Sequence, residues 1–88
     1  MTRDWTEAQA RAWLRASLPK GWRVRVGAGI AGFDGRWAQQ PWVTCDSCGE
    51  FLVERERPRL REACRSLIRA AKRAGIAVND VPEPGGKS

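Results

Sequence analysis

The chain has 88 residues and a net charge of +6, with 16 basic residues against 10 acidic ones. This length suits one domain near the lower size limit for folding on a single core. The sequence contains no apolar run of membrane-spanning length and no signal segment after Met1, so we expect a cytoplasmic protein without a membrane partner. An odd number of cysteines, three, favours reduced thiols or a metal over a secreted disulfide scaffold.

The first predicted element is a helix over residues 5–18. Two capping pairs are available at its start, which are Asp4 with Glu7 and Thr6 with Gln9. Helical spacing places a set of apolar and small residues on one face, which we expect to be buried. This set comprises Ala10, Trp13, Leu14, Ser17 and Leu18.

Three strands are predicted next. The stretch "WRVRV" (residues 22–26) alternates apolar and basic residues, as a half-buried strand does. The stretches "WVTC" (42–45) and "EFLVE" (50–54) follow, and the intervening "DSCG" is short enough for a hairpin. The order of elements predicts an antiparallel three-stranded sheet.

A second helix is predicted after Pro58, which suits a first helical turn. Its apolar stripe continues to Ala74, and Gly75 with Ile76 reads as a helix stop. We therefore expect a two-layer α-β-β-β-α domain over residues 1–78, with both helices on one face of the sheet, and a disordered polar tail over 79–88. The predicted core is Trp13, Leu14, Leu18, Val24, Val26, Leu60, Cys64, Leu67, Ile68 and Ala71.

A glycine motif follows the first strand. Gly27, Gly29 and Gly32 in "VRVGAGIAG" form G-x-G-x-x-G, which resembles the phosphate-binding turn of dinucleotide enzymes and gives a redox fragment as one alternative. That fold needs a helix beginning at the glycines, whereas only eight residues separate Gly32 from Pro41. We therefore favour a flexible glycine-rich loop over residues 27–35 that approaches a ligand closely.

A cysteine pair lies between the second and third predicted strands. Cys45 and Cys48, followed by Gly49, resemble one knuckle of a rubredoxin-like or zinc-ribbon site. The chain has no histidine, and its third cysteine, Cys64, lies on the apolar stripe of the second helix. Three arrangements stay open: two reduced thiols in a turn, one zinc shared by the four cysteines of a homodimer, or a reversible disulfide.

Basic residues concentrate in residues 54–73, which hold eight cations and three anions. Arginines recur every four residues along the second helix, largely opposite its apolar stripe, and their planar guanidinium groups suit phosphate contacts. The alternative is an ordinary solvated face. The predicted nucleic-acid-binding residues are Arg57, Arg61, Arg65, Arg69, Lys72 and Arg73, with Arg23 and Arg25 added if their strand face is solvated.

The order of elements, with a basic second helix, resembles the double-stranded-RNA-binding fold. That resemblance implies phosphate contacts from the second helix and a slight preference for duplex RNA. The stretches "GWRVRVG" and "SLIRAAKRAGIAVNDV" also resemble HicA-type toxins, small RNA-cleaving proteins of this fold. Their catalytic histidine has no counterpart in "GAGIAGF", and no other catalytic constellation is evident. The resemblance therefore supports a fold rather than an enzyme.

The leading interpretation is a non-catalytic nucleic-acid-binding domain. Its main alternative is a protein-interaction or regulatory module of a mobile element that carries the zinc-knuckle-like hairpin. In that case exposed tryptophans, Trp37 and Trp42, would anchor the protein partner.

Overall fold

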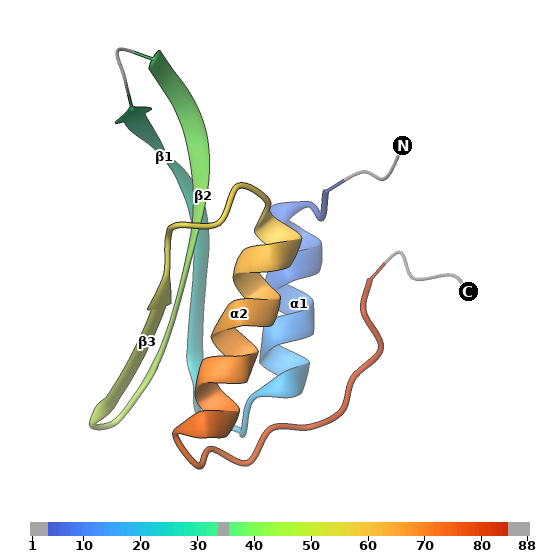
Figure 1. The fold of residues 1–88 in the computed structure, drawn as a ribbon. Coiled ribbons are helices and arrows are strands. Elements are labelled where there is room, and N and C mark those ends of the chain that lie inside the picture. Colours follow the sequence, from blue (N-terminus) through green and yellow to red (C-terminus); the bar gives the residue numbers. More distant parts are fainter. Residues whose placement is uncertain (1–3, 34–35, 85–88) are drawn as a thin grey trace.

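The computed structural model describes residues 4–33 and 36–84, with the backbone alone for residues 31–33 and 36–38. Two helices and three strands follow one another in the order that the sequence predicts. They are α1 (Glu7–Ser17), β1 (Arg23–Phe33), β2 (Arg36–Ser47), β3 (Glu50–Glu54) and α2 (Leu60–Arg73). Both helices lie side by side on one face of the sheet, so the predicted two-layer α+β fold is confirmed (Figure 1).

The sheet is an antiparallel meander with β2 in the centre. In the first hairpin, Val24 of β1 lies opposite Cys45 of β2, and the pairing continues to Phe33 opposite Arg36. In the second hairpin, Cys45 lies opposite Leu52 of β3. Because side chains alternate between the faces of a strand, these pairs fix which residues of each strand face the helices.

The strands of the first hairpin are longer than the predicted residues 22–26 and 42–45, whereas β3 is as predicted. The added residues include glycine, alanine, glutamine and Pro41, which have weak strand preferences. Continuous pairing with the opposite strand offsets those preferences. Pro41 also lies outside the paired segment between β2 and β3, which begins at Val43, so β2 has one neighbouring strand there and its missing N–H is tolerated.

Helix α1 begins with a capping box formed by one of the two predicted pairs. The Thr6 hydroxyl accepts a hydrogen bond from the amide of Gln9, and the Gln9 side chain accepts one from the amide of Thr6. These reciprocal bonds satisfy amides that the first helical turn leaves without partners. The face that carries Trp13 and Leu14 is buried, as predicted.

Helix α2 is capped by a residue from the other end of the chain. Asp4 accepts hydrogen bonds from the amides of Leu60 (2.7 Å) and Arg61 (2.9 Å). Burial acts to raise the pKa of Asp4, but hydrogen bonds from the amides of Arg61, Leu60 and Trp5 outweigh it, and the pKa lies below its ordinary value. At the other end, Gly75 adopts a φ of 85° and Ile76 N–H bonds to the Ala71 carbonyl, which confirms the predicted helix stop.

The core lies between the sheet and the two helices and contains nearly every residue that the patterns predict. Val26 is partly buried rather than fully buried. Trp5 joins the core and meets Trp13 edge to face at 5.2 Å between ring centroids. The buried apolar residues are Trp5, Ala10, Trp13, Leu14, Leu18, Val24, Val43, Cys45, Leu60, Ala63, Cys64, Leu67, Ile68 and Ala71.

The segment after α2 runs back along the helices (Figure 1). Asn79 donates its amide to the Ser17 carbonyl (2.7 Å), and the indole N–H of Trp13 donates to the Val81 carbonyl (3.1 Å). Val81 also packs against the core. Residues 79–84 are therefore docked on the helical layer, which differs from the expected disordered tail; residues 85–88 lie outside the described residues.

Candidate functional site

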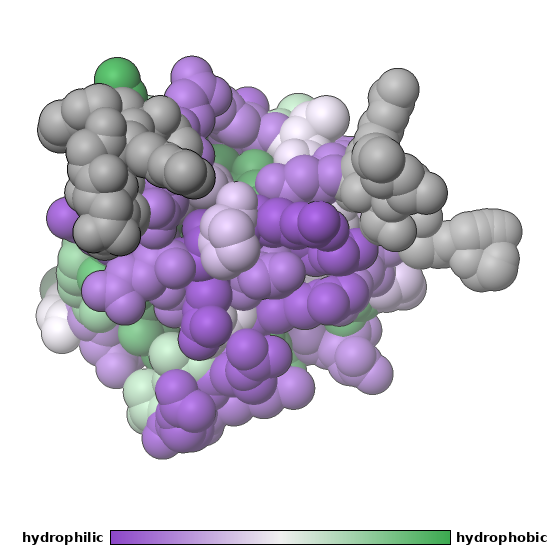
Figure 2. Space-filling view, turned by 45° about the horizontal axis from the view of Figure 1, so that its top comes forward, coloured by the Kyte–Doolittle hydropathy of each residue, from purple (hydrophilic) through white to green (hydrophobic). Residues whose placement is uncertain are grey.

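The basic residues of α2, which we call its basic row, lie on the solvent side of that helix. They are Arg61, Arg65, Arg69, Lys72 and Arg73. The apolar stripe of α2 is buried against the sheet and α1, whereas Arg69, Lys72 and Arg73 are exposed. Arg61 and Arg65, nearer the start of the helix, are partly buried. In the view of Figure 2, hydrophilic residues cover most of the surface, and hydrophobic residues show between them in smaller areas.

The docked C-terminal segment neutralises part of this row. Glu83 accepts two hydrogen bonds from Arg65, one of them from Nε at 2.9 Å. These bonds lower the pKa of Glu83 below its ordinary value and raise that of Arg65. Among the described residues, the side chains of Arg69, Lys72 and Arg73 take part in no ion pair. Arg61 also forms no ion pair among the described residues, but it is partly buried, so the cations of α2 that are both exposed and unpaired lie in its last two turns.

The other predicted cations lie elsewhere. Arg57 is in the connection between β3 and α2, where its Nε is 4.0 Å from a carboxylate oxygen of Glu54. Arg23 and Arg25 lie on the face of the sheet that the helices leave uncovered, and Arg23 pairs with Asp46 at 2.8 Å. The structure thus divides the eight predicted residues among α2, the connection before it and the uncovered face of the sheet, rather than bringing them together.

The prediction of a glycine-rich loop over residues 27–35 is wrong for residues 27–33, and residues 34 and 35 lie outside the described residues. Gly27, Gly29 and Gly32 lie within β1, which continues past them in antiparallel pairing with β2. A helix beginning at the glycines, which dinucleotide binding requires, does not occur in residues 27–33. The physical role of Gly27 is to make room for Trp42 on the opposite strand: a Cβ at position 27 would lie 2.4 Å from Cζ2 of that indole.

Of the two predicted anchor tryptophans, Trp42 lies on the uncovered face of the sheet. Trp42 is partly buried, because its indole lies across the glycines of β1 on the uncovered face of the sheet. The side chain of Trp37 lies outside the described residues. Phe51 of β3, on the same face of the sheet as Trp42, was not predicted as a site residue from the sequence. The alternation of "EFLVE" was the signal, because it places Phe51 and Leu52 on opposite faces.

The three cysteines occupy different environments. Cys48 is exposed in the turn between β2 and β3, whereas Cys45 faces the core from β2 and Cys64 faces it from α2. Burial raises the pKa of Cys45 and of Cys64 to about 12, and the charge of Asp46 adds to the effect at Cys45. Among the described residues, no three side chains of the metal-binding types gather in one place.

Zinc binding by Cys45 and Cys48 stays a prediction. It would require Cys45 to lose its proton in the core, because zinc binds the thiolate. Metal analysis of protein purified without added zinc tests it: half a zinc per chain indicates a site shared by two chains.

In the part of the chain that the structure describes, no helix has the length and apolarity needed to span a membrane.

Comparison of the chain with protein-family models, with curated proteins and with solved structures finds no match. Its function is therefore inferred from the chemistry of the two surfaces, the basic row of α2 and the uncovered face of the sheet.

Proposed function

We propose that this protein is a small non-catalytic domain that binds nucleic acid, with basic side chains of α2 contacting the phosphates. The observation that carries the proposal is the exposure of Arg69, Lys72 and Arg73 without an acidic partner among the described residues. We call these three residues the α2 basic cluster. Duplex RNA is the preferred ligand, since a fold of this order suits recognition by shape.

The spacing of the cluster supports contact with a polyanion. Residues three and four apart lie next to each other on a helix, so the three cations share one surface and repel one another in the free protein. Neutralisation by phosphates removes that repulsion and releases condensed counterions from the nucleic acid. Part of the cluster also has a structural role, because cations in the last turn of a helix complement its dipole.

The test is the triple variant Arg69→Gln, Lys72→Gln and Arg73→Gln. Fluorescence anisotropy should measure its binding to a labelled RNA duplex of about 16 base pairs, and to DNA duplex and single strands, over a series of salt concentrations. Loss of three phosphate contacts should weaken binding to every sequence and flatten the log–log salt slope on duplex DNA by about 2.7. Loss of the helix-dipole interaction costs about 0.3–1 kcal/mol per cation, so thermal melting must show that the variant remains folded.

The matched control removes three cations from elsewhere, by Arg11→Gln, Arg15→Gln and Lys20→Gln. Both triple variants have the same net charge, so an effect confined to the α2 basic cluster identifies a contact surface rather than a general charge effect. Equal affinity and equal salt slope for the α2 variant and the parent would refute the proposal.

The docked C-terminal segment makes a second, opposite test possible. Glu83→Gln removes the carboxylate that holds Arg65 and leaves a side chain of similar size. If phosphates are contacted along α2, the released guanidinium should add one contact, tightening binding and steepening the salt slope on duplex DNA by about 0.9.

A further inference from the structure

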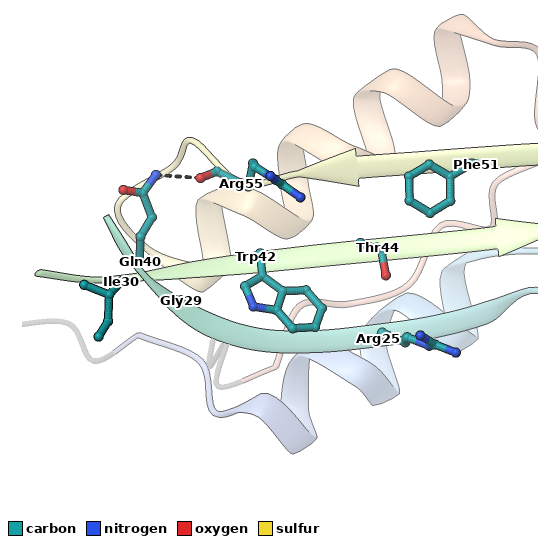
Figure 3. Close-up of a pocket in the computed structure, with 8 residues that line it drawn as sticks. All are labelled: Arg25, Gly29, Ile30, Gln40, Trp42, Thr44, Phe51 and Arg55. Atoms are coloured by element: carbon teal, nitrogen blue, oxygen red, sulfur yellow. Dashed lines mark hydrogen bonds between the residues drawn. The ribbon is translucent and has the colours of Figure 1, made fainter. Parts of the chain in front are cut away.

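The sheet face opposite the helices is open to solvent and carries a shallow pocket, or hollow, of about 590 Å³. β1, β2 and β3 all contribute residues to it, since each strand turns alternate side chains to this side. Figure 3 shows the arrangement: Trp42 lies across β1, with Arg25, Thr44 and Phe51 following along the same face. We call this surface the open sheet face; its hollow is lined by Arg25, Gly29, Ile30, Gln40, Trp42, Thr44, Phe51 and Arg55.

Two aromatic rings on this face are accessible. Phe51 is 63% exposed, although exposure of such a ring to water is unfavourable by the hydrophobic effect. Trp42 is partly exposed, and its position is set by Gly27, which leaves the space that the indole fills. An aromatic group that packs against backbone on one side and borders a hollow on the other is held ready to stack on a flat ligand.

Positive charge surrounds the aromatic rings. Arg25 and Arg55 both line the hollow and are exposed. The backbone of Arg55 is fixed by a hydrogen bond from the Gln40 side chain to its carbonyl, at 2.6 Å (Figure 3). On this face Asp46 pairs with Arg23 at 2.8 Å, and Arg25 and Arg55 form no ion pair among the described residues, so both can contact an anionic ligand.

We infer that the open sheet face binds single-stranded nucleic acid, with unpaired bases stacked on Trp42 and Phe51 and phosphates held by Arg25 and Arg55. Accessible rings beside arginines are the combination that binds single strands without strong sequence preference. Bases inside a duplex are covered by their neighbours and cannot reach such rings. The inference rests on the proposed nucleic-acid binding and adds unpaired bases as the ligand of a second surface.

The register of the strands sets the distance between the stacking positions. Phe51 lies opposite Asp46, which is four residues beyond Trp42 along β2. At about 3.3 Å per residue, the two positions are roughly 13 Å apart along the strand direction. Neighbouring stacked bases are about 3.4 Å apart, so the two rings receive bases that are not adjacent. The nucleic-acid strand between those bases crosses Thr44.

The test compares two labelled single strands of equal length, an oligothymidylate and an abasic deoxyribose-phosphate strand. Phe51→Leu removes the aromatic ring and keeps apolar surface at an exposed position, so it should leave the fold intact. We expect it to weaken oligothymidylate binding by about 5- to 150-fold, the range for loss of one stacked base, with little change for the abasic strand. Val53→Thr, on the same face but without a ring, is the matched control and should bind both strands like the parent.

The outcomes separate this inference from the proposed function. The α2 triple variant removes phosphate contacts on the opposite side of the sheet, so the preference for oligothymidylate over the abasic strand should persist in it, whereas Phe51→Leu should act on the base-bearing strand alone. Equal binding of the two strands by the parent, or unchanged oligothymidylate binding by Phe51→Leu, overturns the inference and leaves the α2 proposal standing. Sedimentation that finds the parent to be a dimer and Phe51→Leu to be a monomer also overturns the inference, since the open sheet face would then bind a second copy of the chain.

Discussion

Gly27→Ala tests the contact that positions Trp42. A Cβ at residue 27 would lie 2.4, 2.8 and 3.1 Å from three carbons of the indole, whereas carbon atoms pack best at about 3.5–4.0 Å. The ring must therefore move by about 1 Å or more. Overpacking of this kind costs about 1–3 kcal/mol, and the reduced freedom of the unfolded chain returns about 0.4–1 kcal/mol. We expect a net loss of about 1 kcal/mol, which lowers the melting temperature by about 4–8 °C.

Gly29→Ala is the matched control, because a Cβ at residue 29 would be 3.8 Å from Trp42, an ordinary contact. This variant should be neutral or more stable by about 0.4–1 kcal/mol. Denaturant unfolding gives both free energies, and the nuclear magnetic resonance signal of the Trp42 indole N–H reports whether the ring has moved. Equal stabilities for the two variants, with an unmoved indole signal in Gly27→Ala, would refute this account of the glycines.

Two further predictions concern the cap of α2 and the thiols. Asp4→Ala should cost about 1 kcal/mol of unfolding free energy at neutral pH. Because the pKa of Asp4 is lowered on folding, the part of this cost that depends on the ionised carboxylate should be present above about pH 4 and should be lost as the pH falls through the folded pKa. Thr6→Ala, which removes a cap that does not titrate, should cost the same free energy at neutral and at acid pH. An Asp4→Ala effect that does not change with pH would contradict the role of the Asp4 carboxylate in capping α2. A thiol reagent should modify exposed Cys48 in the native protein, whereas buried Cys45 and Cys64, with a pKa of about 12, should react only on unfolding. Mass spectrometry of the labelled peptides decides this. Labelling of Cys45 in the native protein would count against its burial.

The fold could be predicted because each helix shows one apolar face and the strands alternate. Patterns of this kind report burial, and burial is decided by the layers. The strand ends could not be predicted, since the residues around Gly29 and Pro41 pair through their backbones in spite of weak strand preferences. The cap on α2 was equally hidden from local reasoning, because Asp4 and Leu60 are 56 residues apart in sequence.

The candidate surfaces were predictable only in part. Helical spacing placed the cations of α2 on one side, but which of them are neutralised depends on Glu83, a residue of the segment expected to be a tail. The same sequence reasoning combined Arg25 with the cations of α2, although the sheet separates the two. Trp42 could not be connected with Gly27 without the register of the first hairpin, which pairs those two residues.

The attachment of both ends of the chain to the helical layer has a consequence for the order of folding. Each strand hairpin joins residues close in sequence, so it can form early and fast. The bonds from Asp4 to α2 and from Trp13 to Val81 span 56 to 68 residues, and closing such loops costs entropy before any contact repays it. During synthesis, the hairpins can therefore pair before α2 has left the ribosome and completed the helical layer. A chaperone that meets the nascent chain would encounter a formed meander whose apolar face is still uncovered.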